Sequence, residues 1–129
     1  MPLVRISLRS GRSAAQKQAI SDGIHRAMVE TIGVPPDDRF QIVTEHADGE
    51  GLIADPRYLG VERTDGVVMI QIALRRGRTV EQKKALYRRI ADNLAAAPAS
   101  VRPQDVFVAL VENDLADWSF GNGEAQYVR

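Results

Sequence analysis

The chain has 129 residues, of which 44% are hydrophobic and 26% charged, and its 17 basic and 17 acidic side chains give a formal net charge of zero. This size and composition predict a single globular domain over residues 1–129 that needs no metal or disulfide to fold. The balanced charge excludes the global field that draws proteins onto nucleic acids or anionic membranes, and the absence of cysteine excludes thiol nucleophiles and thiolate metal sites.

The first residues alternate between apolar and polar side chains, which predicts a strand with Val4, Ile6 and Leu8 on one face. No signal-peptide pattern precedes it and no apolar run approaches membrane-spanning length, so we expect a cytoplasmic protein with no membrane partner. Pro2 becomes the amino terminus if Met1 is removed. A terminal amine titrates near ~8 and, held at the end of a core strand, is a candidate acid or base, although a proline at this position is also common by chance.

A twelve-residue segment that starts at Ile6 returns 66 residues later at Ile72, with seven of the twelve positions identical. In both copies a helix is expected next, because Ser13 and Thr79 are each followed three residues later by glutamine, the capping-box pattern of a helix start. Apolar residues then recur every four positions and form one stripe on each helix: Ile20, Ile24 and Met28 in the first copy, and Leu86, Ile90 and Leu94 in the second.

Each copy closes with a proline, an aspartate and an extended run, so the sequence predicts two β-α-β units over about 2–45 and 66–112. Residues 46–65 are rich in Gly and Asp and are expected to form a loop with a short strand or turn, and residues 113–129 form a tail. Right-handed crossovers pair the strands of each unit in parallel. We therefore expect an α/β fold of the two-layer α+β type, a four-stranded, mainly parallel sheet with two helices on one face. The other face is expected to be buried against neighbouring subunits.

Three arginines, Arg75, Arg76 and Arg78, surround a glycine at the expected strand-to-helix junction of the second unit. Guanidinium groups bind carboxylates in a bidentate manner and a helix start adds a favourable potential, so this cluster is a candidate carboxylate site. Arg9 and Arg12 occupy the equivalent positions in the first unit, which leaves helix capping or surface ion pairing as an equal alternative.

Asp38 lies just before the second strand, where an aspartate either forms a turn with its own backbone or carries function. In the tail, Trp118, Phe120 and Tyr127 are three of the seven aromatic residues of the chain. Trp118 and Phe120 are candidates for a pocket wall as well as for core or interface packing. The two histidines lack a second ligand at metal-binding spacing, so no metal site is predicted.

The chain resembles the tautomerase superfamily, and within it the malonate semialdehyde decarboxylase family, in Pro2 on a strand, in the doubled unit and in three segments: GVPPDDRFQIV at 33–43, RGRTVEQK at 76–83 and DWSFG at 117–121. The resemblance spans essentially the whole chain. It implies the following roles: Pro2 as the catalytic amine, Asp38 as its carboxylate partner, Arg76 and Arg78 as catalytic arginines that bind the substrate carboxylate, and Arg75, Trp118 and Phe120 as further substrate-binding residues. Whether Arg75 or Arg76 pairs with Arg78 stays open.

The activity that this resemblance implies is decarboxylation of a short β-keto acid such as malonate semialdehyde, by a homotrimer that uses no cofactor. Protonated Pro2 would polarise the substrate carbonyl or condense with it as an iminium. Two alternatives stay open within the same fold: keto–enol tautomerisation with neutral Pro2 as base, and hydration or dehalogenation of unsaturated three-carbon acids with Asp38 activating water. A further alternative is a non-catalytic trimer that has kept the fold.

Overall fold

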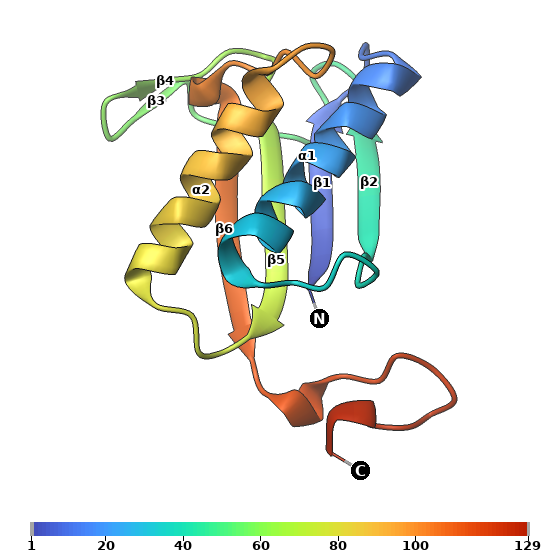
Figure 1. Cartoon of the computed structure of the whole chain (residues 1–129). Coiled ribbons are helices and arrows are strands. Elements are labelled where there is room, and N and C mark those ends of the chain that lie inside the picture. Colours follow the sequence, from blue (N-terminus) through green and yellow to red (C-terminus); the bar gives the residue numbers. More distant parts are fainter. Residues whose placement is uncertain (1, 129) are drawn as a thin grey trace.

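The computed structural model describes residues 2–128 and places the helices and strands in the expected order (Figure 1). The short strands β3 (Arg57–Tyr58) and β4 (Val61–Glu62) form a hairpin within residues 46–65, where a short strand or turn was expected. The tail holds two short 3-10 turns in place of regular structure. The elements are β1 (Leu3–Arg9), α1 (Ala14–Ile32), β2 (Gln41–His46), β3 (Arg57–Tyr58), β4 (Val61–Glu62), β5 (Val68–Arg75), α2 (Val80–Ala95) and β6 (Val106–Asn113).

The main sheet has the strand order β2-β1-β5-β6. Strands β1 and β2 are parallel, as are β5 and β6, which confirms the two predicted β-α-β units. The two units meet through β1 and β5, which run antiparallel with Leu3 opposite Ala73 and Leu8 opposite Val68. The predicted fold class is therefore confirmed, and the sheet is mixed because its two halves are related by an approximate twofold axis.

The sequence repeat is also a repeat of backbone contacts. The amide of Ser10, just past β1, donates to the His46 carbonyl at 2.8 Å, and the amide of Arg76, just past β5, donates to the Asn113 carbonyl at the same distance. Because the first strands of the two units are antiparallel, each end of the sheet combines the start of one unit with the strand-to-helix junction of the other (Figure 1). The fold thus contains two equivalent corners.

The core lies between the sheet and the two helices, which cross the same face of the sheet (Figure 1). Ser13 and Thr79 form complete capping boxes at the helix starts, as predicted. Both predicted apolar stripes are buried, and burial of each large aliphatic side chain contributes roughly 1.5–3 kcal/mol. The fully buried side chains of the helices are Ile20, Ile24, Met28, Leu86, Ile90 and Leu94, and those of the sheet are Val4, Ile6, Leu8, Ile70, Ile72 and Leu74.

The opposite face of the sheet keeps large apolar side chains accessible. Its exposed residues include Ile42 on β2 and Phe107 and Val111 on β6, between 41% and 46% exposed. A face of this kind usually marks an interaction surface, and its burial by neighbouring subunits stays a prediction. Within residues 2–128, no helix has the length and apolar character needed to cross a membrane.

Candidate functional site

One end of the sheet brings together the start of β1, the end of β5, the start of α2 and the C-terminal tail (Figure 1). A cavity of about 360 Å³ opens there, and it contains the predicted residues Asp38, Arg75 and Arg78. An acid and two arginines from two segments far apart in the sequence therefore share one cavity. Its remaining lining residues are Gly33, Val34, Pro35, Leu115 and Tyr127.

Arg78 is the half-buried cation of this cavity. Its guanidinium donates to the carbonyl oxygens of Arg75 at 3.2 Å and Ile32 at 3.3 Å, so its position is fixed by the backbone. Burial and, second, the charge of Arg75 lower the pKa of Arg78, while Glu112 acts in the opposite direction. An arginine nevertheless stays charged in proteins. A bound carboxylate would therefore offset both the free-energy cost of burying the Arg78 charge and the repulsion between Arg78 and Arg75.

Arg76 lies at an adjoining cavity of about 290 Å³, which Arg75 and Arg78 also line, and it does not line the cavity that contains Asp38. Its Nε donates to Oδ1 of Asp114 at 3.0 Å, and 63% of the Arg76 side chain is exposed. Exposed ion pairs contribute little free energy. A ligand carboxylate could therefore take the place of Asp114 at a small cost.

A third cavity, of about 420 Å³, is lined by aromatic, aliphatic and polar residues. Trp118 and Phe120 are stacked, with ring centroids 5.7 Å apart and planes inclined by 9°. Phe120 also contacts Phe40, at 5.7 Å, and Tyr127, edge to face at 5.2 Å. The tail rings thus pack on one another at this cavity, and the role of Trp118 and Phe120 as a substrate wall stays a prediction. The cavity is lined by Leu3, Phe40, Ala73, Asn113, Asp117, Trp118, Ser119 and Phe120.

Side-chain hydrogen bonds hold the tail in this position. The indole Nε1 of Trp118 donates to Oδ1 of Asn113 at 2.8 Å, which fixes the ring next to the end of β6. The Gln126 side chain accepts from the Phe120 amide and donates to the Gly121 carbonyl, both at 2.9 Å. The wall is therefore built by the tail and anchored to the sheet.

Pro2 is buried at the start of β1. It lines none of the three cavities, whereas the next residue, Leu3, lines the aromatic one. The amide of Val4 donates to the Phe40 carbonyl at 3.0 Å, so Pro2 lies at the end of the sheet where the segment that carries Asp38 enters β2. Met1 lies outside the described residues, and its removal stays a prediction.

The segment that carries Asp38 is anchored to α1 by its neighbour Arg39. The guanidinium of Arg39 donates to Oδ1 of Asp22 at 2.7 Å and to Oε1 of Gln41 at 3.2 Å. The hydrogen bond from Arg39 is the largest cause that lowers the pKa of Asp22, and burial acts in the opposite direction. Phe40 then packs the same segment against the tail, so the two residues that follow Asp38 are both fixed.

His25 is one of the two histidines for which no metal binding was predicted. Its Nε2 contacts the Pro36 carbonyl at 2.8 Å. In the described part of the chain, no three His, Asp or Glu side chains are grouped closely enough to hold a metal ion. Phe40, Tyr127 and Leu115 line the cavities although the sequence did not single them out as site residues. For Tyr127 the aromatic composition of the tail was a usable signal, and for Phe40 its position two residues after Asp38.

Two family models, both described as "Tautomerase enzyme", match residues 38–121 and 2–58. The chain is 49% identical over 128 residues to "Probable tautomerase YusQ" of Bacillus subtilis (strain 168), covering 99% of each chain. It is similar to two solved malonate semialdehyde decarboxylases. One was studied for its decarboxylase and hydratase activities; it is 40% identical, with a TM-score of 0.88 over 98% of this chain and 95% of that one. The other, the FG41 enzyme inhibited by 3-bromopropiolate, is 45% identical, with a TM-score of 0.90 over 98% of this chain and 94% of that one. A fused 4-OT that forms a symmetric trimer is 26% identical, with a TM-score of 0.74 over 95% and 94% of the chains.

The anchoring of the Asp38 segment is testable through Asp22. Replacement Arg39→Ala is expected to raise the pKa of Asp22 toward its ordinary value, measured by NMR titration of the carboxyl carbon, because the main hydrogen bond is lost. Arg26→Ala is the matched control, since the charge of Arg26 is the weakest of the causes that lower the pKa of Asp22 and its loss should shift that pKa less.

The effect of Arg39→Ala on the free energy of unfolding depends on pH. A lowered pKa in the folded state contributes stability above the ordinary pKa, and this contribution is lost as the pH falls through the lowered value. Arg39→Ala should therefore destabilise by less than about 1 kcal/mol at pH 7 and by nothing in strong acid. An unchanged Asp22 pKa in Arg39→Ala would contradict the anchoring.

Proposed function

The chain belongs to the tautomerase family, and on this premise we propose that it decarboxylates a short β-keto acid such as malonate semialdehyde. It is an enzyme of that superfamily, which argues against the non-catalytic alternative. The observation that carries the proposal is the cavity that joins Asp38 to two arginines beside an aromatic wall, in a chain 40–45% identical to solved malonate semialdehyde decarboxylases.

In this proposal Arg78 and Arg76 bind the substrate carboxylate. Backbone carbonyls fix the position of Arg78. Burial and the charge of Arg75 disfavour its positive charge, and both effects favour the binding of a carboxylate. Arg76 reaches the same carboxylate by exchanging its exposed ion pair with Asp114. Arg75 lines both cavities and adds a third positive charge, so it contributes to binding through the local potential.

Pro2 is proposed as the group that stabilises the electron pair left by the breaking bond. After removal of Met1, a nearby carboxylate such as that of Asp38 would favour the protonated amine. The Pro2 ammonium donates a hydrogen bond to the aldehyde oxygen, the bond between the methylene and carboxylate carbons breaks, and carbon dioxide leaves. The electron pair passes into the enolate, which takes a proton at carbon to give acetaldehyde.

The covalent route gives the same two products, carbon dioxide and acetaldehyde. Neutral Pro2 attacks the aldehyde carbon, water leaves, and the resulting iminium accepts the electron pair on loss of carbon dioxide to form an enamine. Protonation of the enamine and hydrolysis release acetaldehyde and regenerate the amine. In either route the rings of Trp118 and Phe120 exclude water from the carboxylate that leaves, which lowers the cost of losing its charge.

We also propose that the protein works as a homotrimer. The exposed apolar face of the sheet supports this, because Ile42, Phe107 and Val111 are too large and too accessible for a face that stays in water. The fused 4-OT of the same fold forms a symmetric trimer, which adds a second line of support.

A second candidate is keto–enol tautomerisation, since a relative 49% identical to the chain is described as a probable tautomerase. It requires Pro2 to be a neutral base at working pH, whereas the hydrogen-bonding route to decarboxylation requires it to be protonated. Hydration or dehalogenation of unsaturated three-carbon acids is a third candidate, supported by the hydratase activity studied in one solved neighbour.

We expect purified protein to convert malonate semialdehyde to carbon dioxide and acetaldehyde. Pro2→Ala should lower kcat/KM by at least ~100-fold, because a positioned proton donor contributes 10²–10⁴-fold. Intact mass establishes loss of Met1 in both proteins, so the comparison is between two free amino termini. A rate unchanged by Pro2→Ala excludes this reactive centre. An NMR titration that places the pKa of the Pro2 nitrogen below working pH excludes the hydrogen-bonding route and leaves the covalent route and tautomerisation.

The arginine roles predict a graded series. Arg78→Ala and Arg76→Ala should each lower kcat/KM by roughly 10- to 100-fold, since a hydrogen bond between charged groups contributes about 1.5–3 kcal/mol. Asp114→Asn frees Arg76 and should lower KM slightly. Arg88→Ala, exposed on α2, is the control and should leave both constants unchanged. Equal kinetics for Arg78→Ala and Arg88→Ala would remove Arg78 from the site.

A further inference from the structure

The far end of the sheet repeats the frame of the candidate site. Arg9 ends β1 and Arg12 precedes α1, as Arg75 ends β5 and Arg78 precedes α2. The two junctions are 66 residues apart and share the same backbone hydrogen bond to the neighbouring strand. The two pairs of arginines are therefore equivalent in position as well as in sequence.

The acid of the site is repeated as well. Asp105 lies immediately before β6, as Asp38 lies before β2, and it is 2% exposed. The repeat of 66 residues places Val68, the first residue of β5, where Pro2 lies in the first unit. The far end thus keeps two arginines and an aspartate of the frame and lacks the amine, because Val68 is an internal residue of the chain.

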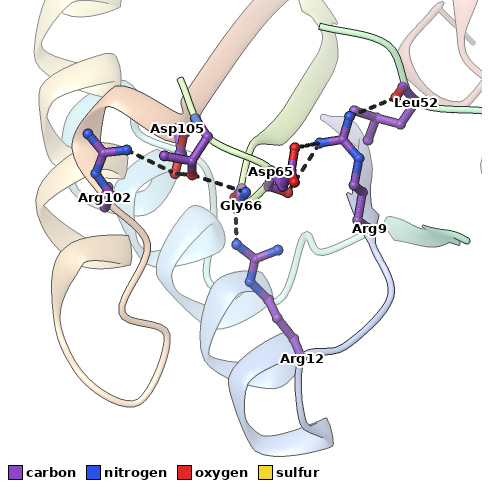
Figure 2. A network of polar contacts seen from close by, with 8 residues as sticks. Arg9, Arg12, Leu52, Asp65, Gly66, Arg102 and Asp105 are labelled. Carbon is purple, nitrogen blue, oxygen red and sulfur yellow. Dashed lines mark hydrogen bonds and ion pairs between the residues drawn. The ribbon is translucent and has the colours of Figure 1, made fainter. Parts of the chain in front are cut away.

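What differs is the segment that supplies the hydrogen-bond acceptors of the arginines. Arg78 binds carbonyls of its own junction and of the end of α1, whereas both far-end arginines bind carbonyls of the segment between the two units (Figure 2). The guanidinium of Arg9 donates to the carbonyl oxygens of Leu52 at 3.0 Å and Asp65 at 3.2 Å. The guanidinium of Arg12 donates to the Gly66 carbonyl at 2.5 Å. Three backbone oxygens of the segment between the two units therefore stand on the two guanidinium groups, where oxygens of a carboxylate would bind.

The aspartate holds this segment in place. Oδ1 of Asp105 accepts from the Thr64 amide at 2.7 Å and Oδ2 accepts from the Thr64 hydroxyl at 2.6 Å. The same hydroxyl accepts from the Gly66 amide at 3.1 Å. Arg102 lies 3.9 Å from Oδ2 and balances the charge of the buried carboxylate (Figure 2). Hydrogen bonds to a buried carboxylate are among the stronger ones in proteins.

The packing around Gly66 leaves no spare room. A Cβ atom added there would lie 3.2 Å from Oδ2 of Asp105, 3.3 Å from Oγ1 of Thr64 and 3.4 Å from the Arg12 guanidinium. Burial is the main cause that lowers the pKa of Arg12, and Asp105 opposes it. The guanidinium is thus partly removed from water, and the chain at Gly66 lies between it and Asp105.

We propose that the far end of the sheet is a second carboxylate-binding site of the same design as the candidate site, which the chain keeps closed with the backbone carbonyls of Leu52, Asp65 and Gly66. In this interpretation residues 52–66 act as an internal plug. The corner is silent in catalysis because Val68 offers no amine and Ser10 stands where the other corner has Arg76. Its arginines serve stability as long as the plug is in place.

Opening the plug should uncover the site. Thr64→Val removes the hydroxyl that links Asp105 to Gly66 and leaves every arginine intact, and Gly66→Ala crowds the same point. Thr64→Ser keeps the hydroxyl and is the matched control. All three are made in an Arg76→Ala/Arg78→Ala background, which removes both carboxylate-binding arginines of the candidate site. The probe is malonate, a dicarboxylate, compared with sodium chloride at equal ionic strength.

The measurement is the melting temperature of the full chain with and without malonate. An opened variant should melt several degrees higher in malonate, because a ligand that binds only the folded state stabilises it. The background alone and its Thr64→Ser form should not respond, and adding Arg12→Ala to an opened variant should abolish the response. The proposal is overturned if neither opened variant responds to malonate, or if the response survives Arg12→Ala. Because no activity is read, this outcome is independent of the proposed decarboxylation.

Discussion

The antiparallel pairing of β1 and β5 at the centre of the sheet determines where everything else lies. It aligns the beginning of one β-α-β unit with the strand-to-helix junction of the other, since Leu3 pairs with Ala73 and Leu8 with Val68. A single unit could not place Asp38 next to Arg75 and Arg78, because its own arginines lie at the opposite end of its strand. The cavity is therefore a product of pairing two units, and neither unit contains it alone.

The same pairing creates a second corner, and the two corners differ because the segment that connects the two units crosses only one of them. At the Pro2 end Arg75 and Arg78 line a cavity, and the carbonyls that Arg78 binds belong to Arg75 and Ile32. At the other end the chain crosses from β2 to β5, and the connection passes over Arg9 and Arg12. Equivalent side chains consequently line a cavity at one corner and bind the connecting segment at the other.

Much of this architecture follows from the sequence, because periodic burial and capping are local properties. The repeat, the capping boxes at Ser13 and Thr79 and the apolar stripes of both helices were all predictable, and the structure confirms them. What could not be predicted depends on irregular segments. The contacts of Phe40 with Phe120, the separation of Arg76 from the Asp38 cavity and the capture of Arg12 by Gly66 follow from loop paths that have no periodic signal. The role of Pro2 depends on a cleavage that neither the sequence pattern nor the fold determines.

Within residues 114–128, the tail that carries Trp118 and Phe120 contributes no residue to the buried core. Its rings touch the rest of the chain through Phe40 and through the bond from Trp118 to Asn113. The selectivity of the cavity and the folding of the domain are therefore separate properties of the chain. Mutation in the last fifteen or so residues can reshape the wall, and so the range of acids admitted, with little effect on the free energy of unfolding. For a duplicated scaffold with fixed arginines, this is the part of the molecule in which new substrate preferences can arise at low risk to the fold.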